Sequence, residues 1–485
     1  MSTQSYAFQR SANFIAGHWV DATTKEALEV RNPATGEVLG EVPNGGAQDA
    51  RHAIAAARTA FVELRGTTAD QRASWLRALY QNIKDGEEEL ARLLTAEQGK
   101  PLQEARAEIA LGANYVLWFA EEARRIYGDI IPSPWPERRL LVQKQPVGVV
   151  AAITPWNFPF SMIARKVGAA VAAGCTVVVK PASETPLSAL AWGVLCEAAG
   201  VPAGVVNIIT GRAADIGGEM TSSPDVDKIS FTGSTAVGKL LLKQAAESVK
   251  KVSMELGGNA PFIVFDDAQI DRAVQGAMAA KFRNAGQTCV CANRIYVQTG
   301  IYDEFVRKFA AATAALKVGN GQEAGVEQGP LISEGAVSKV EELVADATSK
   351  GASVVTGGQR HQIGGSFYEP TVLSSANQNM RIAREEIFGP VAAIFPFETE
   401  QSAVEMANDT EYGLACYFYT ENTARMFRVM ERLNYGLVGV NEALITTEVA
   451  PFGGMKASGI GREGSKYGIE DYLEIKYACI GHIFD

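Results

Sequence analysis

The feature that most constrains the fold is a regular alternation of short aliphatic runs with longer amphipathic segments between Val147 and Glu255. The short runs predict strands at 147–153, 176–180, 205–210, 228–232 and 251–255. The segments between them carry apolar residues at helical spacing and predict helices at 160–173, 186–199, 213–221 and 234–247. Strands that alternate with helices in this way form a doubly wound parallel sheet, whose ligands bind at the carboxyl ends of the strands.

The segments on either side of this region complete the predicted architecture. A second alternating series between Phe262 and Asn441 predicts a second lobe of the same class, and residues 45–127 predict a run of helices. Prolines at 132, 134 and 136 exclude a helix, and residues 138–144 predict an exposed strand. A strand flanked by proline and charge is typical of an arm that packs on another subunit. We therefore predict an α/β chain with two doubly wound lobes and a β arm.

The composition argues against several classes of protein. The 485 residues carry a net charge of −10, so a surface that follows the phosphates of a nucleic acid is not expected. The N-terminal segment lacks the basic start and apolar core of a signal peptide. The uncharged stretch 145–164 is interrupted by Pro155 and Pro159, and strand and helix patterns explain it better than a membrane span. We expect a soluble, cytoplasmic protein without nucleic-acid or membrane partners.

Cysteine and histidine usage argues against a metal site. Six cysteines in a chain of this length do not form a disulfide framework, and none shows the C-x₂-C spacing of a zinc site. The four histidines are widely scattered. A nucleophilic cysteine in this chain is therefore expected to use a carboxylate as its base.

Cys289 and Glu255 are the candidate catalytic pair. Cys289 ends the small, polar segment Gly286-Gln287-Thr288-Cys289, and Glu255 ends the fifth predicted strand and is followed by Leu256-Gly257-Gly258. A thiol and a carboxylate in separate glycine-marked turns indicate a nucleophile and a base that converge from separate loops. The alternative is that Cys289 is an ordinary small core residue and Glu255 a solvated carboxylate.

Two glycine-rich segments resemble nucleotide-binding motifs. Residues 459–464 match G-x-G-x-x-G, but no predicted strand leads into them, so a dinucleotide site is not expected there. Residues 233–239 follow a predicted strand and resemble a Walker A loop, but Leu240 stands where a magnesium-binding hydroxyl is needed. Backbone N–H groups at the start of the helix that follows Gly233, together with Ser234, still predict an anion site.

The loop Lys180-Pro181-Ala182-Ser183 follows the second predicted strand, where the ribose of a cofactor lies in such a sheet. A lysine and a small hydroxyl there favour a 2′-phosphate, whereas a carboxylate at position 183 would repel it. The alternative is a loop that only caps the helix beginning at Pro186.

A set of ordered motifs resembles the aldehyde dehydrogenase superfamily along most of the chain. These motifs are Pro155-Trp156-Asn157-Phe158-Pro159, Lys180-Pro181-Ala182-Ser183, Phe231-Thr232-Gly233-Ser234, Glu255-Leu256-Gly257-Gly258-Asn259, Gly286-Gln287-Thr288-Cys289, Glu386-Ile387-Phe388-Gly389-Pro390 and Pro451-Phe452-Gly453-Gly454. The segments 289–294 and 461–472 are most similar to the bacterial succinate-semialdehyde dehydrogenases. The resemblance implies a cofactor-binding domain of residues 1–128 and 146–255, a catalytic domain of residues 256–460, and an oligomerisation arm of residues 129–145 and 461–485. It also implies a homodimer or homotetramer.

The resemblance assigns roles to the candidate residues. Cys289 attacks the aldehyde, the Asn157 amide and the Cys289 backbone N–H stabilise the oxyanion, and Glu255 activates the water that hydrolyses the thioester. The implied cofactor is NADP, with NAD as the alternative. The residues that the resemblance places around it are Trp156, Lys180, Pro181, Ala182, Ser183, Gly233, Ser234, Leu256, Glu386 and Phe388, with Glu386 on the nicotinamide ribose.

The resemblance also assigns the substrate site. Arg165 and Arg283 match the positions that hold the carboxylate of succinate semialdehyde, and arginine forks pair well with carboxylates. Thr446 stands where a serine commonly assists. The implied reaction is the oxidation of succinate semialdehyde to succinate, and the alternative substrate is glutarate semialdehyde or another ω-carboxylated aldehyde. For each arginine the alternative is an ion pair between domains or at the surface.

Three further alternatives remain. Cys291 either closes a regulatory disulfide with Cys289 or is a buried neighbour. The Walker-like loop leaves open a P-loop nucleotide-binding protein, and the whole chain leaves open a catalytically inactive structural relative.

Overall fold

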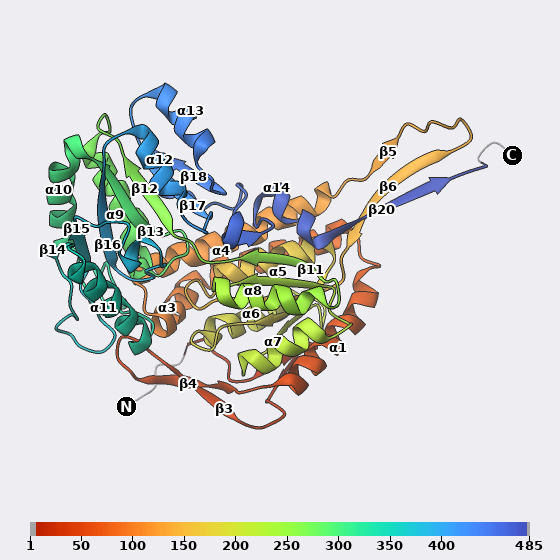
Figure 1. Cartoon of the computed structure of the whole chain (residues 1–485). Coiled ribbons are helices and arrows are strands. Elements are labelled where there is room, and N and C mark those ends of the chain that lie inside the picture. Colours follow the sequence, from red (N-terminus) through yellow and green to blue (C-terminus); the bar gives the residue numbers. More distant parts are fainter. Residues whose placement is uncertain (1–5, 483–485) are drawn as a thin grey trace.

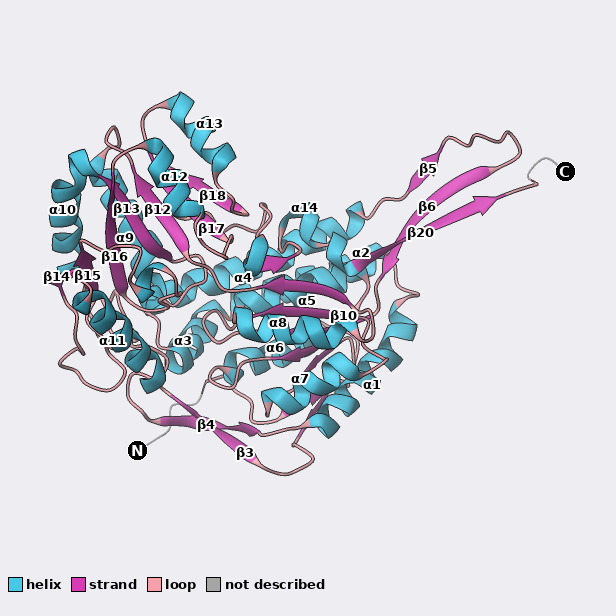
Figure 2. Ribbon diagram, viewed as in Figure 1, coloured by secondary structure: helices cyan, strands magenta, loops and turns pink. Residues whose placement is uncertain are grey.

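The computed structural model describes residues 6–482 and consists of two α/β lobes and a projecting β arm (Figures 1 and 2). The first lobe is built on an eight-stranded sheet in the order β19-β11-β10-β7-β8-β9-β1-β2. Its parallel centre is formed by β7 (Val149–Ile153), β8 (Thr176–Lys180), β9 (Val206–Ile208), β10 (Lys228–Thr232) and β11 (Lys251–Glu255). Antiparallel strands close both edges: β1 (Asn13–Ile15), β2 (His18–Val20) and β19 (Gly459–Ile460). The predicted doubly wound sheet is confirmed.

Helices cover both faces of this sheet, which explains why its strands are apolar along their whole length. In β8, Val177 and Val179 face one core, and Val178 faces the other. The first core is formed mainly by α2 (Ala69–Asp85), α3 (Glu87–Gln98), α4 (Leu102–Glu122), α5 (Ser161–Ala173) and α6 (Pro186–Ala198). The second is formed by α1 (Ala47–Leu64), α7 (Ala213–Ser222) and α8 (Thr235–Ala246). The two layers leave the carboxyl ends of the strands free to build a site.

The second lobe contains a seven-stranded sheet in the order β14-β15-β16-β13-β12-β17-β18. Its strands are β12 (Ala260–Val264), β13 (Ala292–Gln298), β14 (Ser353–Thr356), β15 (Thr371–Ser374), β16 (Val391–Phe397), β17 (Ala415–Tyr419) and β18 (Leu437–Val440). Its helices are α9 (Ile270–Phe282), α10 (Tyr302–Ala314), α11 (Glu334–Ser349), α12 (Glu400–Asn408) and α13 (Thr423–Arg432). All strand pairs are parallel except β14–β15 at one edge.

The arm is a three-stranded antiparallel sheet that extends away from both lobes (Figure 1). It consists of β5 (Asp129–Ile131), β6 (Arg139–Pro146) and β20 (Leu473–Ile480), with β6 in the centre. Ile130, Ile475 and Tyr477 on this sheet are exposed. The strand predicted at 138–144 is thereby confirmed, and its partner comes from the other end of the described chain.

Several elements have no counterpart in the prediction, because each is short or depends on a distant partner. They are the four strands before Asn44, including the hairpin β3 (Ala27–Arg31) and β4 (Val38–Pro43), and also β15, α12, α13, β19, α14 (Ser465–Gly468) and β20. The segment 459–464 forms edge strand β19 on β11 and the turn after it. A Cβ at Gly459, whose φ is +146°, would lie 2.0 Å from the Met254 carbonyl oxygen. The close approach of the two backbones explains why position 459 is a glycine, and no bound nucleotide is needed to explain it.

The predicted C-terminal segment 461–485 contributes to two parts of the structure. Ile469 and Tyr472 pack in the core of the first lobe, whereas β20 belongs to the arm. The domain boundaries drawn from the sequence stay a prediction. Among residues 6–482, none of the helices combines the length and the apolarity needed to cross a membrane.

Candidate active site

The candidate catalytic residues meet where the strands of the first lobe end and face the second lobe. Asn157 follows β7, and Glu255 is the last residue of β11, beside Thr232 on β10. Cys289 comes from the second lobe, on the segment between α9 and β13. A central parallel sheet places the ends of neighbouring strands at one edge, so residues distant in sequence converge there.

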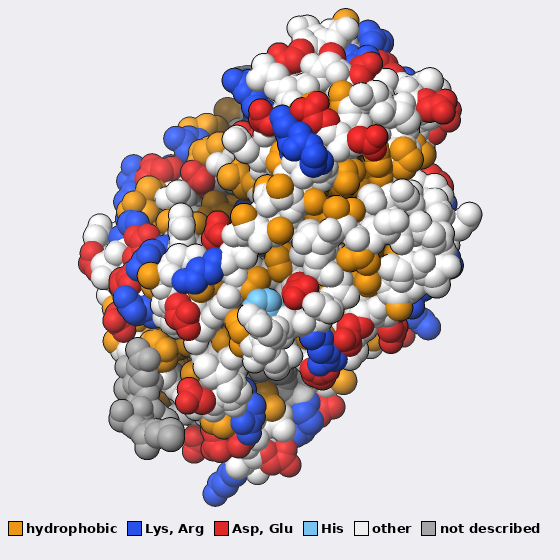
Figure 3. All heavy atoms as spheres, turned by 90° about the vertical axis from the view of Figure 1, so that its left-hand side faces the viewer, with side chains coloured by type: hydrophobic (Ala, Val, Ile, Leu, Met, Phe, Trp, Pro, Cys, Tyr) orange, Lys and Arg blue, Asp and Glu red, His pale blue; other side chains and the backbone are white. Residues whose placement is uncertain are grey.

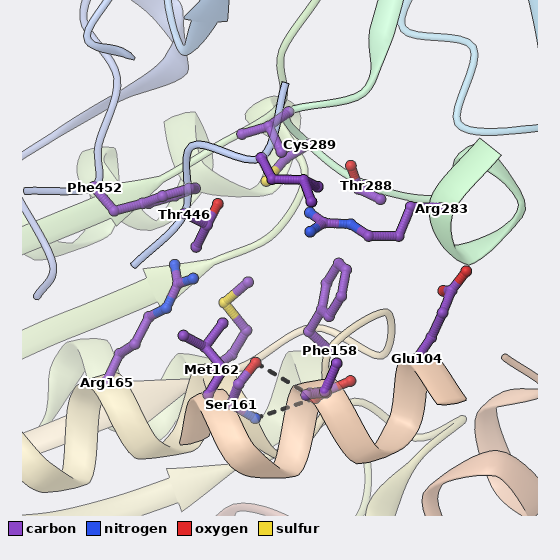
Figure 4. A pocket seen from close by; sticks show the side chains of 15 residues that line it. Glu104, Phe158, Ser161, Met162, Arg165, Arg283, Thr288, Cys289, Thr446 and Phe452 are labelled. Carbon is purple, nitrogen blue, oxygen red and sulfur yellow. Dashed lines mark hydrogen bonds between the residues drawn. The ribbon is translucent and has the colours of Figure 1, made fainter. Parts of the chain in front are cut away.

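Cys289 lies between two cavities of about 290 Å³ each and lines both. The first cavity, drawn in Figure 4, contains Arg165, Arg283 and Thr446. The second contains Asn157 and Glu255. A thiol at the junction of two cavities can contact a ligand from each side.

The segment that carries Cys289 has an unusual backbone. Asn284, Ala285 and Gly286 have φ values of 52°, 54° and 74°, in the left-handed region. A Cβ at Gly286 would lie 2.2 Å from the Gly389 carbonyl oxygen, so only glycine fits there. The Asn284 backbone N–H donates to Glu104 at 2.8 Å, and the Cys291 N–H donates to the Thr288 carbonyl at 3.1 Å. Strain held in place by surrounding contacts is typical of a functional loop.

Burial dominates the electrostatics of the two catalytic candidates. The pKa of the half-buried Cys289 thiol is raised to about 12, mainly by burial and next by the charge of Glu386, while Arg165 opposes both effects. Burial also raises the pKa of the Glu255 carboxyl well above its ordinary value, with the charge of Glu463 as the next cause. Neither Glu255 oxygen has a hydrogen-bond partner within residues 6–482. A thiol of this kind attacks a carbonyl only when a base accepts its proton.

Hydrogen bonds fix both the side-chain amide and the backbone carbonyl of Asn157. Its Nδ2 donates to the Gln287 carbonyl at 3.0 Å, and its backbone carbonyl accepts hydrogen bonds from Lys100 Nζ at 2.7 Å and Asn284 Nδ2 at 3.1 Å. The side chain is 4% exposed. One Asn157 amide hydrogen remains for another acceptor, because an amide nitrogen carries two.

The second cavity contains most of the predicted cofactor residues. Trp156 and Phe388 form an edge-to-face pair with centroids 5.5 Å apart, and Gly233, Ser234, Leu256 and Glu386 also line the cavity. Ser234 is the N-cap of α8 and accepts from the Val237 N–H. Glu386 accepts from the Gly258 N–H at 3.1 Å, and burial raises the pKa of the Glu386 carboxyl to about 7.

The loop from Lys180 to Ser183 does not line this cavity. It lies one strand further along, at the end of β8. Lys180 is 3% exposed, and its ammonium donates to the Pro181 carbonyl at 2.7 Å. Burial lowers the pKa of Lys180 to about 8, and Glu184 opposes this effect. Ala182 and Ser183 are half-buried in the same loop.

The first cavity brings both predicted arginines and Thr446 together. Figure 4 shows the Arg165 and Arg283 guanidinium groups entering it from α5 and from the Cys289 segment. Arg165 lies between the rings of Tyr115 and Phe452, at 4.8 and 4.3 Å from their centroids. Its Nε and Nη1 have no hydrogen-bond partner in the described part of the chain, and Glu463 Oε2 lies 3.7 Å from Nη1.

Cys291 lies apart from both cavities. It is 2% exposed, and its sulfur accepts a hydrogen bond from Lys281 Nζ at 3.2 Å. Both Cys289 and Cys291 are free thiols in the structure. A disulfide between them stays a prediction, and so does the absence of a metal. Across residues 6–482, no three His, Cys, Asp or Glu side chains are grouped to hold a metal ion.

Sequence reasoning missed residues that reach the site through tertiary packing. Glu104 and Tyr115 come from α4, and Glu463 comes from the segment dismissed as a false nucleotide motif. Glu463 pairs with Lys166 Nζ at 2.6 Å and influences Glu255. Within α4 the helical periodicity marks buried positions, but nothing in it distinguishes a cavity wall from a core. Gly453 allows the loop before Glu463 to approach, because a Cβ there would lie 2.8 Å from Glu255 Oε1.

The two α/β lobes bring a half-buried thiol to the junction of two cavities, an arrangement typical of enzymes that use a cysteine on bound ligands. Residues 19–478 match the model of the aldehyde dehydrogenase family. The chain belongs to this family. The predicted fold class and enzyme class are thereby confirmed.

Similar proteins cover nearly the whole chain. The chain is 60% identical to 3-sulfolactaldehyde dehydrogenase of Pseudomonas putida over 97% of each chain. It is 58% identical to glutarate-semialdehyde dehydrogenase of Pseudomonas aeruginosa over 98% of each, and 58% identical to the NADP(+) succinate-semialdehyde dehydrogenase GabD of Escherichia coli over 97% of this chain and 98% of GabD. The crystal structure of succinate-semialdehyde dehydrogenase from Burkholderia pseudomallei superimposes with a TM-score of 0.98, at 54% identity over 99% of this chain and 100% of that one.

Proposed function

We propose that this aldehyde dehydrogenase oxidises succinate semialdehyde to succinate with NADP as the preferred acceptor and NAD as a weaker one. The observation that carries the substrate assignment is the pair of cations in the first cavity. Arg165 and Arg283 enter the same space as Cys289. Arg165 has a long ion pair with Glu463 at 3.7 Å, and neither guanidinium donates a hydrogen bond to a carboxylate in the described chain. A short aldehyde with an anionic tail matches a thiol at one end of a cavity and guanidinium groups further in.

The second cavity fits a nicotinamide dinucleotide. Gly233 and the capped start of α8 offer backbone N–H groups for a pyrophosphate, and Glu386 offers a carboxylate for a ribose. Among residues 6–482 the Lys180 ammonium has only the Pro181 carbonyl oxygen as a hydrogen-bond acceptor, so it is available for a 2′-phosphate. Ser183 adds a hydroxyl without a charge. These features support the NADP preference, as does the NADP(+) named for the Escherichia coli relative GabD. When bound, the nicotinamide supplies the hydride acceptor that turns a thiohemiacetal into a thioester.

Side chains of the protein itself accept and donate the protons of the reaction. Attack by the Cys289 sulfur on the aldehyde carbon requires removal of the thiol proton, because the pKa of about 12 keeps Cys289 neutral. Glu255, whose oxygens are unpartnered, accepts that proton through the second cavity. The Asn157 amide and the Cys289 backbone N–H donate to the oxyanion that forms. After releasing that proton to solvent, Glu255 takes a proton from the water that attacks the thioester. It passes this proton to the departing Cys289 sulfur, which releases the acid and the free thiol.

Glutarate semialdehyde is the second candidate substrate. The cavity of about 290 Å³ is larger than the four-carbon substrate requires, and one methylene changes discrimination by only about 1–3 kcal/mol. The relatives that act on glutarate semialdehyde and on 3-sulfolactaldehyde are as similar to this chain as the succinate-semialdehyde enzyme. We therefore expect measurable turnover of several short aldehydes with an anionic tail.

The assembly, the domain division and the location are parts of the same proposal. The exposed apolar residues of the arm, among them Ile130 and Ile475, support a homodimer or homotetramer in which the arm packs on another subunit. The two sheets support a cofactor domain of residues 1–128 and 146–255 and a catalytic domain of residues 256–460, except that strand β19 (Gly459–Ile460) pairs with β11 in the first sheet. Acidic and basic side chains are interspersed on the face in Figure 3, which supports a cytoplasmic enzyme without a nucleic-acid partner.

The proposal is tested by the absorbance of reduced nicotinamide with NADP and NAD across a panel of aldehydes. We expect the highest kcat/KM for succinate semialdehyde with NADP, a lower value for glutarate semialdehyde, and values at least tenfold lower for butanal. Equal kcat/KM values for butanal and succinate semialdehyde would refute the role of the arginines. A higher value for NAD than for NADP would refute the cofactor assignment alone.

A further inference from the structure

Lys100 is a fully buried lysine that touches neither cavity, yet it contacts the loop of Asn157. Its side chain is 0% exposed and lies between α3 and α4, beside Pro101, the N-cap of α4. The ammonium donates to Glu108 Oε2 at 2.6 Å and to the Asn157 carbonyl at 2.7 Å, and it lies 3.9 Å from the centroid of the Phe158 ring. A lysine this deep is not explained by solubility or by a surface ion pair.

Stability is also a weak explanation for the pair. Removing two charges from water costs several kcal/mol per ion, and well-packed apolar residues often replace such pairs without loss. What the pair provides is a fixed geometry. Glu108 Oε1 accepts the backbone N–H groups of Phe160 and Ser161 at 3.0 and 3.1 Å, at the start of α5. The carboxylate therefore holds the loop after Asn157, while Lys100 holds Asn157 itself.

The Asn157 carbonyl is the point where both lobes hold this loop. Lys100 donates to it from the first lobe, and Asn284 Nδ2 donates to it from the strained segment of the second. The Asn157 amide in turn donates to the Gln287 carbonyl, two residues before Cys289. This chain of hydrogen bonds fixes the oxyanion donor relative to the nucleophile.

The backbone around Lys100 is itself held against the second lobe. The Leu102 N–H donates to the Gly321 carbonyl at 2.9 Å. A Cβ at Gly321 would lie 2.4 Å from the Lys100 carbonyl oxygen, and one at Gly329 would lie 2.1 Å from the Gly99 carbonyl oxygen. Two glycines of the second lobe thus allow it to approach the turn that carries Lys100. The backbone that carries Lys100 is consequently held by both lobes.

We propose that Lys100, through its hydrogen bond to the Asn157 carbonyl, is a positioning residue that holds the Asn157 amide where the oxyanion forms. This proposal rests on the oxyanion role assigned to Asn157 above. Losing a single oxyanion donor costs about 10²–10³-fold in kcat, and a misplacement of about 1 Å costs on the order of 10²-fold. A donor that is loosened but still present is expected to lose less than one that is deleted.

The test uses a variant without charge, so that no lone carboxylate stays buried. In Lys100→Met with Glu108→Gln, we expect kcat for succinate semialdehyde to fall about 10–100-fold, while the affinity for NADP changes less than about threefold. KM is not diagnostic for this variant, because Glu108 also lines the first cavity. In the Asn157→Ala background, the same pair of substitutions is expected to change kcat by less than about threefold, because the group that it positions is already gone. A purely structural role would lower kcat by the same factor in both backgrounds.

Matched controls separate positioning from damage to the fold. Glu97 is also a fully buried carboxylate, and it accepts the Leu187 and Ser188 N–H groups at the start of α6. It has no lysine partner in the part of the chain that the structure describes. Glu97→Gln should reproduce any loss of stability without the selective loss of kcat. Asn284→Gly removes the second donor to the Asn157 carbonyl, and glycine accepts the φ of 52°. It should show the same loss of kcat and the same lack of additivity, which keeps the test valid if the first variant does not fold.

The outcomes distinguish this proposal from the proposed function. Parent-like kcat in the Lys100 and Asn284 variants, or additive losses with Asn157→Ala, would overturn the positioning role while the oxyanion role stands. An Asn157→Ala variant with unchanged kcat would overturn the oxyanion role and the positioning role with it.

Discussion

Replacing Arg165 by methionine tests how the enzyme recognises the tail of its substrate. Arg165 is 3% exposed and lies between two aromatic rings, so methionine fills most of its volume without a charge. Its Nε and Nη1 are the buried donors without a partner in the described chain. A hydrogen bond to a charged group contributes about 1.5–3 kcal/mol, so two of them contribute at least about 3 kcal/mol. This corresponds to roughly a 150-fold loss in kcat/KM for succinate semialdehyde.

Butanal, an aldehyde without a carboxylate, separates the effect of Arg165 on carboxylate binding from its effect on the reaction at Cys289. Arg165 also lowers the pKa of Cys289 and of Glu255, so its removal slows every aldehyde to some extent. The ratio of kcat/KM for succinate semialdehyde to that for butanal removes this shared effect and should fall roughly 100-fold. Arg72→Met serves as the control, because Arg72 is half-buried on α2 and donates to the Ala172 and Thr67 carbonyls, away from Cys289. A ratio that stays within threefold of the parent value would refute the argument.

Two further substitutions test the surroundings of the site. Glu463→Gln removes a charge that raises the pKa of Glu255. Because a base acts only when it is deprotonated, the acid limb of the pH profile of kcat/KM should move to lower pH. An unchanged acid limb would contradict the electrostatic coupling between Glu463 and Glu255. Gly459→Ala places a Cβ 2.0 Å from the Met254 carbonyl oxygen at a φ of +146° and should lower the free energy of unfolding by about 2 kcal/mol or more. Gly217 is buried on α7, but a Cβ there would meet no neighbouring atom within 4 Å, so Gly217→Ala should cost nothing measurable. Thermal melting compares the two variants, and equal melting temperatures would refute the steric argument.

The central parallel strands could be predicted because burial on both faces leaves continuous aliphatic runs in the sequence. The meeting of Asn157 and Glu255 follows from the same pattern, since strand ends at one edge of a sheet lie together. The resemblance groups residues 461–485 with 129–145 in one arm, but the pairing of strand β20 with β6 could not be predicted, because nothing local in residues 473–480 encodes it. The edge strand β19 was hidden for a similar reason, since its glycines serve a close approach to β11.

The walls of the site were less predictable than its reactive groups. Cys289 and Glu255 stand out because their residue types carry the chemistry, whereas Phe452 and Tyr115 become relevant only when the fold places their rings against Arg165. The contact of Lys100 with the Asn157 carbonyl is also invisible in the sequence, because the hydrogen bond uses a backbone atom. Side-chain identity can be read from a chain, but backbone acceptors become specific only in three dimensions.

The central claim is that the Cys289 sulfur forms the covalent bond to the substrate. The most direct measurement is NADPH formation by Cys289→Ala at saturating succinate semialdehyde, with Cys479→Ala as a control because Cys479 is exposed on the arm. If Cys289 is the nucleophile, kcat falls at least about 10³-fold in the first variant, and the second keeps the parent activity. A Cys289→Ala enzyme that keeps kcat within tenfold of the parent value, with cofactor binding intact, would contradict this claim.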